Sequence, residues 1–207
     1  INLRSPPKTT MKPAIPPEYV AFAGELADAA GGVILQYWRQ PRVALPEKEE
    51  PGRAMPTSPV TLADRGAEAA MRRLIAERYP AHGVLGEEYG ASPNVREFHE
   101  TTPFETAEWQ WVLDPIDGTK SFMTGKPVFG TLVALCHRGA PVVGVIDQCV
   151  LKERWVGVLG SSSSERCATL NGVRIDSDEK TAADLVPSSL ASCFAYATTP
   201  DMFAEGD

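Results

Sequence analysis

The sequence predicts a layered α+β fold in which two helices precede a largely antiparallel sheet. Apolar residues recur at helical spacing over residues 18–39 and 62–79, and strand-length apolar segments follow. Two of those segments, 129–137 and 141–150, are joined by Arg138-Gly139-Ala140, a short glycine-containing connection typical of a hairpin. Helices followed by strands indicate layers packed on a common core.

The N-terminal third alternates between expected helix and expected loop. Residues 1–17 are rich in Pro, Lys and Thr and are expected to form a flexible arm. The first helix is expected to start at about residue 18, after two prolines, and to end near Arg39. Residues 41–59 mix Pro, Gly and charge, which predicts an exposed, mobile loop of the length found in lids and binding loops. The second helix, 62–79, stops before Pro80.

The rest of the chain is expected to build the sheet and to begin a further layer. The expected strands are 83–85, 110–113, 129–137, 141–150 and 154–159. Residues 160–165 contain a run of serines and are expected to form a polar turn. We therefore predict a catalytic α+β domain over 18–185, and the beginning of an incomplete C-terminal α/β subdomain over 186–207.

Composition excludes several classes of function. The net charge is -7 and no run of Lys and Arg occurs, which argues against a nucleic-acid partner. The apolar runs are far shorter than the ~20 residues that span a bilayer, so no membrane segment is expected. The cysteines are widely spaced with no C-x-x-C pair, which favours reduced thiols over a disulfide framework or zinc site and argues against secretion. These cysteines are Cys136, Cys149, Cys167 and Cys193.

The segment from Trp111 to Thr119 carries the most specific chemistry. An apolar strand is expected to end at Asp114, with a turn at Pro115 and a second carboxylate at Asp117. Such a cluster of like charges is unfavourable unless a cation neutralises it, and hard oxygen ligands suit Mg²⁺. Gly118 would let the backbone approach a ligand closely. Read alone, the same residues also fit a plain turn.

Two further acidic positions lie where expected elements begin or end. Asp64 opens the second helix, and Glu87-Glu88 follows the strand 83–85. In isolation, Asp64 is a favourable helix-start acid and the glutamates are a solvated surface pair. Together with Asp114 and Asp117, they supply enough carboxylates for two or three metal ions in metal-assisted phosphoryl chemistry.

These motifs resemble those of the inositol monophosphatase family. The resemblance rests on P-V-T-x-A-D at 59–64, G-E-E at 86–88 and W-V-L-D-P-I-D-G-T at 111–119, in that order. It implies a five-layer α-β-α-β-α sandwich of the inositol monophosphatase and sugar phosphatase type. The family places a further metal-binding Asp in a W-D-x-A-A-like segment, and none occurs before Asp207. The C-terminal part of the sandwich is therefore expected to lie outside this sequence.

The resemblance also implies roles for individual residues. Glu87, Asp114, the Ile116 carbonyl and Asp117 are implied to bind Mg²⁺, and Asp64 a further, weaker ion. Thr119 and Glu87 are implied to orient the attacking water, with Asp64 beside them in the catalytic group. The backbone of Gly118 and Thr119 is implied to hold the phosphate. Two or three Mg²⁺ ions, inhibition by Li⁺ and a homodimer are also expected.

The residues after Thr119 indicate the branch of the family. Lys120-Ser121-Phe122 and the sequence that continues to Trp155 are most similar to the plant and bacterial histidinol-phosphate phosphatase type, whereas inositol monophosphatases usually carry Thr-Asn-Phe there. The expected reaction is hydrolysis of L-histidinol phosphate to L-histidinol and phosphate in histidine biosynthesis. The expected compartment is the chloroplast stroma for a plant protein, or otherwise the cytoplasm.

Two other functions stay open at this point. One is hydrolysis of inositol 1-phosphate or a related small phosphate monoester. The other is a metal- and phosphate-binding module without turnover, because the C-terminal ligand is missing.

Several other polar and aromatic residues are expected to have minor or structural roles. Lys48 and Glu49 are assigned to a mobile metal loop only by analogy, and Lys126 and Arg154 are candidate phosphate contacts that fit solvent-exposed roles equally well. A catalytic triad is not supported, because no nucleophile motif accompanies the histidines. Surface or structural roles are expected for His82, His99 and His137, and core or interface positions for Trp109, Trp111 and Trp155.

Overall fold

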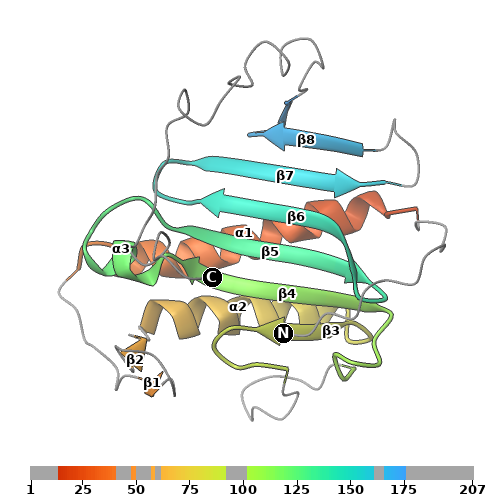
Figure 1. The fold of residues 1–207 in the computed structure, drawn as a ribbon, viewed down its shortest axis with the longest axis horizontal. Coiled ribbons are helices and arrows are strands. Elements are labelled where there is room, and N and C mark those ends of the chain that lie inside the picture. The colour runs from red at the N-terminus through yellow and green to blue at the C-terminus, as the bar shows by residue number, and fades with distance from the viewer. Residues whose placement is uncertain are drawn as a thin grey trace, which may run out of the picture. The chain divides into compact units, whose positions relative to one another are not determined.

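Two helices lie side by side on one face of a seven-stranded sheet (Figure 1). This computed structural model describes residues 14–40, 62–91, 102–160 and 166–175, and the backbone alone of 48–49 and 57–58. The chain divides into two units, residues 1–175 and 176–207, and every described residue belongs to the first.

The helices form where the sequence predicts them. Helix α1 spans Pro17–Tyr37 and helix α2 spans Leu62–Arg78. Proline stands in the first turn of α1, where its missing N–H costs nothing, and the Trp38 N–H ends the helix by donating to the Ile34 carbonyl at 3.1 Å. Helix α1 thus ends two residues before the predicted Arg39. Both helices present small and apolar side chains to each other and to the sheet.

The sheet is largely antiparallel, as predicted, with strand order β3-β4-β5-β6-β7-β8-β9. Only the first pair, β3 and β4, is parallel. The strands are β3 Gly83–Gly86, β4 Trp109–Asp117, β5 Gly130–His137, β6 Ala140–Gln148, β7 Glu153–Leu159, β8 Arg166–Leu170 and β9 Val173–Arg174. Strands β8 and β9 were not predicted. Their sequences alternate only weakly between apolar and polar residues, and β9 has two residues.

The core lies between the helices and the sheet. Trp111 and Phe22 are fully buried, with ring centroids 5.5 Å apart. The Trp111 indole N–H donates to His82 Nδ1 at 3.1 Å, and His82 stacks on Tyr79 at 4.8 Å. His82 is therefore structural, as expected. Trp109 and Trp155 are half-buried.

Several expectations fall partly or wholly outside the described residues. Within the loop 41–59, the backbone of Lys48–Glu49 (β1) pairs antiparallel with that of Thr57–Ser58 (β2). The arm before residue 14, the serine run at 161–164, His99, Cys193 and the segment 188–197 lie outside the described residues. Cys136, Cys149 and Cys167 are free thiols. None of the described helices is long and apolar enough to cross a membrane.

Candidate active site

A bulge in β4 places the two aspartates of the D-P-I-D motif. The predicted strand ended at Asp114, but β4 continues to Asp117, so that expectation was wrong. Asp114 pairs with Leu132 and Asp117 pairs with Gly130, so that Pro115 and Ile116 together face one residue of β5. A bulge of this kind bends the strand and redirects its side chains. Pairing with β5 resumes past the proline, at Asp117 and Gly130.

Two threonine hydroxyls hold the carbonyls of the bulge. Thr131 Oγ1 donates to the Pro115 carbonyl at 2.8 Å, and Thr131 is 1% exposed. Thr119 Oγ1 donates to the Ile116 carbonyl at 3.1 Å. The Ile116 side chain is fully buried, so its carbonyl is the group that can serve a ligand. The structure thus brings Thr119 and the Ile116 carbonyl into direct contact.

Gly118 turns the chain from β4 into the short helix α3, Thr119–Met123. Its φ is 90°, in the left-handed region that a side chain disfavours, and a Cβ there would stand 3.1 Å from the Val128 carbonyl oxygen. Both the dihedral angle and the close approach therefore require glycine. A helical turn begins at Thr119, directly after Gly118.

The two glutamates after β3 differ in their surroundings. The Glu87 N–H donates to the Leu113 carbonyl at 3.1 Å, which ties this residue to β4 next to Asp114, and its side chain is exposed. The Glu88 side chain is only 6% exposed and lies 3.8 Å from Arg65 in an ion pair. The expectation of a solvated surface pair is therefore wrong for Glu88. Glu87 is the glutamate available to a ligand.

Asp114 is the electrostatic centre of the site. Burial raises its pKa to about 8, and the charge of Glu87, a hydrogen bond shared with Glu87, and the charges of Asp117 and Asp64 act in the same direction. Asp64, in the first turn of α2, is 3% exposed. The structure thus brings together the four carboxylates that the sequence singled out.

The donor set fits a hard divalent cation. Asp114 Oδ1 is a buried oxygen with no hydrogen-bond partner, a costly arrangement that a cation would relieve. Within the described part of the chain, no three His, Cys, Asp or Glu side chains are already arranged to hold a metal ion. Glu87 and Asp117 are exposed, so their carboxylates are free to turn toward Asp114 Oδ1 without disturbing the core.

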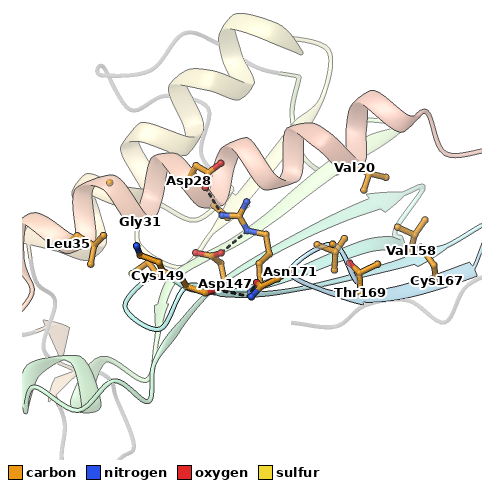
Figure 2. A pocket seen from close by; sticks show the side chains of 16 residues that line it. Val20, Asp28, Gly31, Leu35, Asp147, Cys149, Val158, Cys167, Thr169 and Asn171 are labelled. Carbon is orange, nitrogen blue, oxygen red and sulfur yellow. Dashed lines mark hydrogen bonds and ion pairs between the residues drawn. The ribbon is translucent and has the colours of Figure 1, made fainter. Parts of the chain in front are cut away.

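A hollow of about 620 Å³ lies elsewhere, between α1 and the strands β6 to β8 (Figure 2). In it, Arg154 lies between Asp28 and Asp147, with nitrogen–oxygen distances of 2.6 and 2.7 Å. Two carboxylates neutralise this guanidinium, which makes it a poor receptor for phosphate. The hollow is lined by no residue of the three motifs, so it is not the site that the motifs indicate.

A family model confirms the resemblance drawn from the motifs. The model of the inositol monophosphatase family matches residues 16–205. This chain belongs to the inositol monophosphatase family. Among solved structures, an inositol monophosphatase from Zymomonas mobilis matches with a TM-score of 0.55 and 37% identity, over 76% of this chain and 52% of that chain. An IMPase from Thermotoga maritima matches with a TM-score of 0.60 and 25% identity, over 78% and 54%.

Curated members of the family include close matches in sequence. The bifunctional phosphatase IMPL2, chloroplastic, of Arabidopsis thaliana is 42% identical over 90% of this chain and 46% of its own length. A histidinol-phosphatase of Mycobacterium tuberculosis is 40% identical over 56% of this chain and 40% of its own length. The chain spans about half the length of the curated relatives it matches.

Sequence reasoning missed three residues that shape the site. Thr131 falls within the expected strand 129–137 and Glu68 within the expected second helix, whereas Arg72 was expected on the outward face of that helix but is 5% exposed. The sequence does carry a signal for Glu68 and Arg72. Together with Asp64 they recur every four residues, on the helix face that also carries Ala67 and Met71. Charged residues on an apolar face indicate buried partners.

Proposed function

We propose that this chain carries the metal- and phosphate-binding site of a phosphatase for small phosphate monoesters, with L-histidinol phosphate as the substrate. The observation that carries the proposal is the unpartnered, buried Asp114 Oδ1 among three further carboxylates. Four neighbouring carboxylates repel one another, and a cation would offset that repulsion whereas a neutral ligand would not.

Glu87, Asp114, the Ile116 carbonyl and Asp117 would hold Mg²⁺, and Asp64 would serve a further ion. When bound, Mg²⁺ supplies a Lewis acid that acidifies a water and neutralises phosphoryl oxygens. The magnesium requirement itself stays part of the proposal, as does inhibition by Li⁺.

The residues around the ion would orient the attack on phosphorus. The Thr119 hydroxyl donates to the Ile116 carbonyl, and its lone pairs remain able to accept a hydrogen bond from a water. The Glu87 side chain is exposed and would take the proton of that water. The backbone N–H groups of Gly118 and Thr119 would hold the phosphate.

The relatives support histidinol phosphate over other phosphate monoesters as the substrate. The histidinol-phosphatases of Mycobacterium tuberculosis and Chlorobaculum parvum are 40% and 35% identical to this chain, whereas the inositol-1-monophosphatase of Synechocystis is 32% identical. Inositol 1-phosphate is the second candidate, favoured by the 37% identity to the Zymomonas enzyme. The homodimer and the chloroplast or cytoplasmic location remain predictions.

The test is phosphate release from histidinol phosphate and from inositol 1-phosphate, each with Mg²⁺ and with EDTA. The proposal predicts Mg²⁺-dependent release that favours histidinol phosphate. Release that favours inositol 1-phosphate would assign the second substrate. No release from either compound by a chain that binds Mg²⁺ would indicate a binding module without turnover and contradict the proposed activity.

A further inference from the structure

Helix α2 presents three buried charged residues to the loop that carries Glu87. Asp64, Glu68 and Arg72 follow one another at intervals of four residues, so they lie on one face of the helix. They are 3%, 0% and 5% exposed. Asp64 lies among the carboxylates around Asp114, whereas Glu68 and Arg72 lie one and two turns further along α2.

Glu68 and Arg72 contact each other and the loop 86–90. Arg72 Nε donates to Glu68 Oε1 at 2.7 Å. The second carboxylate oxygen, Glu68 Oε2, accepts the Glu88 backbone N–H at 2.8 Å. Arg72 Nη2 donates to the Gly90 carbonyl. The pair therefore binds the backbone of the loop at two places.

The loop fits this pair closely. Gly86 and Gly90 close the loop with two backbone hydrogen bonds of 3.1 and 2.9 Å. A Cβ on Gly86 would stand 1.9 Å from Glu68 Oε1, so the carboxylate occupies the space that any side chain at this position would need. The glycine of the G-E-E motif is thus required by a carboxylate on another element.

Two neighbouring amides of the loop are held by two different elements. The Glu87 N–H bonds to Leu113 in β4, one residue before Asp114, and the Glu88 N–H bonds to Glu68 in α2. With both amides fixed, the backbone of Glu87 has a defined position between helix and sheet. This places Glu87 beside Asp114, whose pKa the charge of Glu87 raises.

We propose that Glu68 and Arg72 are positioning residues that clamp the loop 86–90 and so hold Glu87 beside Asp114. The inference rests on the proposed function, because it treats Glu87 as a metal ligand. A buried ion pair gains little net stability, since removing both charges from water offsets their attraction. The contacts with Glu88 and Gly90 give this pair a role in geometry that its stability alone does not explain.

The variant that tests the clamp is Glu68→Gln. Glutamine has the same shape, but only one of its two terminal atoms accepts hydrogen bonds. If its oxygen faces the Glu88 N–H, its NH₂ group faces the Arg72 guanidinium, so one contact is always lost. The matched control is Asp147→Asn, which alters another buried carboxylate, 2.7 Å from Arg154 and outside the site.

The first measurement is hydrogen exchange of the Glu87 and Glu88 amides in the metal-free chain. Glu68→Gln is expected to accelerate their exchange relative to the amides of β5 and β6, and Asp147→Asn is expected to leave it unchanged. The second is calorimetric titration with Mg²⁺. Glu68→Gln is expected to weaken binding about 10- to 100-fold, the usual effect of losing a residue that orients a ligand.

The outcomes separate this inference from the proposed function. A wild-type chain that binds no Mg²⁺ overturns the metal site itself. A wild-type chain that binds Mg²⁺, together with a Glu68→Gln variant that binds equally well and exchanges no faster, overturns the clamp alone. If Glu68→Gln does not fold, Arg72→Lys replaces it. This variant keeps the charge but loses the fork that reaches Gly90, and wild-type values for it in both measurements would also overturn the clamp.

Discussion

Burial shifts the pKa values of His82 and Asp114 in opposite directions, and the two residues differ in whether their polar atoms have hydrogen-bond partners. It lowers the pKa of His82 to about 4, which keeps that ring neutral, and it raises the pKa of Asp114 to about 8, a shift that a bound cation would oppose. His82 is satisfied as a neutral ring, because it accepts the Trp111 indole N–H and stacks on Tyr79. Asp114 keeps an unpartnered oxygen among like charges. The first residue belongs to the core and the second to the proposed metal site.

The neutral state of His82 predicts how stability depends on pH. The pKa in the folded chain lies below the ordinary value of 6.5, so the unfolded chain binds the extra proton between pH 6.5 and about 4. The stability from this residue is therefore complete above pH 6.5 and falls as the pH drops toward 4, by up to about 3 kcal/mol. We expect urea unfolding at pH 6.5 and 4.5 to show this loss.

The variant His82→Gln isolates this effect from other titrating groups. Glutamine can still accept the Trp111 indole N–H but does not titrate. Its free energy of unfolding is expected to fall less between the two pH values than that of the wild type. An equal fall in both chains would show that His82 does not contribute.

At the scale of elements, the site is formed by distortions of the regular structure. Strand β4 would run straight past β5 without the bulge at Pro115 and Ile116, and Asp117 would then not follow Asp114 into the same site. Thr131 in β5 holds this bulge through the Pro115 carbonyl. Gly118 then admits the left-handed turn into α3. Loop 86–90 is closed in a similar way by its own two glycines.

The bulge predicts a measurable role for the Thr131 hydroxyl. Thr131→Val keeps the shape of the side chain but leaves the buried Pro115 carbonyl without this donor. We expect a loss of about 1–3 kcal/mol in the free energy of unfolding, together with weaker Mg²⁺ binding.

A second threonine on the same chain provides the control for this prediction. Thr106 is exposed and donates to the Pro103 carbonyl at 3.2 Å. Thr106→Val is expected to change stability by less than about 0.5 kcal/mol. Equal losses from the two variants in urea unfolding would contradict the role given to Thr131.

At the scale of the whole molecule, the regular elements were predictable and their distortions were not. Helices α1 and α2 have long apolar stripes, and β5 and β6 are joined by a short glycine turn. These patterns predict two helices and a hairpin without a competing alternative. The bulge in β4 depends on Thr131, which lies sixteen residues after Pro115, and local pattern carries no such information. The close approach of Glu68 to Gly86 likewise forms only when α2 packs against the sheet.

The candidate residues could be predicted more fully than their geometry. Their positions at the ends of expected elements singled out Asp64, Glu87, Glu88, Asp114 and Asp117, and the family resemblance implied which of them bind metal. Position alone did not separate Glu87 from Glu88, whose side chain is buried and paired with Arg65. That difference arises because α2 covers one glutamate and leaves the other exposed.

The central claim is that Asp114 and its neighbours bind Mg²⁺, and calorimetric titration of the full chain with Mg²⁺ tests it most directly. The wild-type chain is expected to bind, and Asp114→Asn is expected to bind at least about tenfold more weakly, because it removes a charge next to the ion without changing the shape of the side chain. Asp147→Asn, at a buried acid outside the site, is expected to bind as the wild type does. Equal Mg²⁺ binding by the wild type and Asp114→Asn, or no binding by the wild type, would contradict the account.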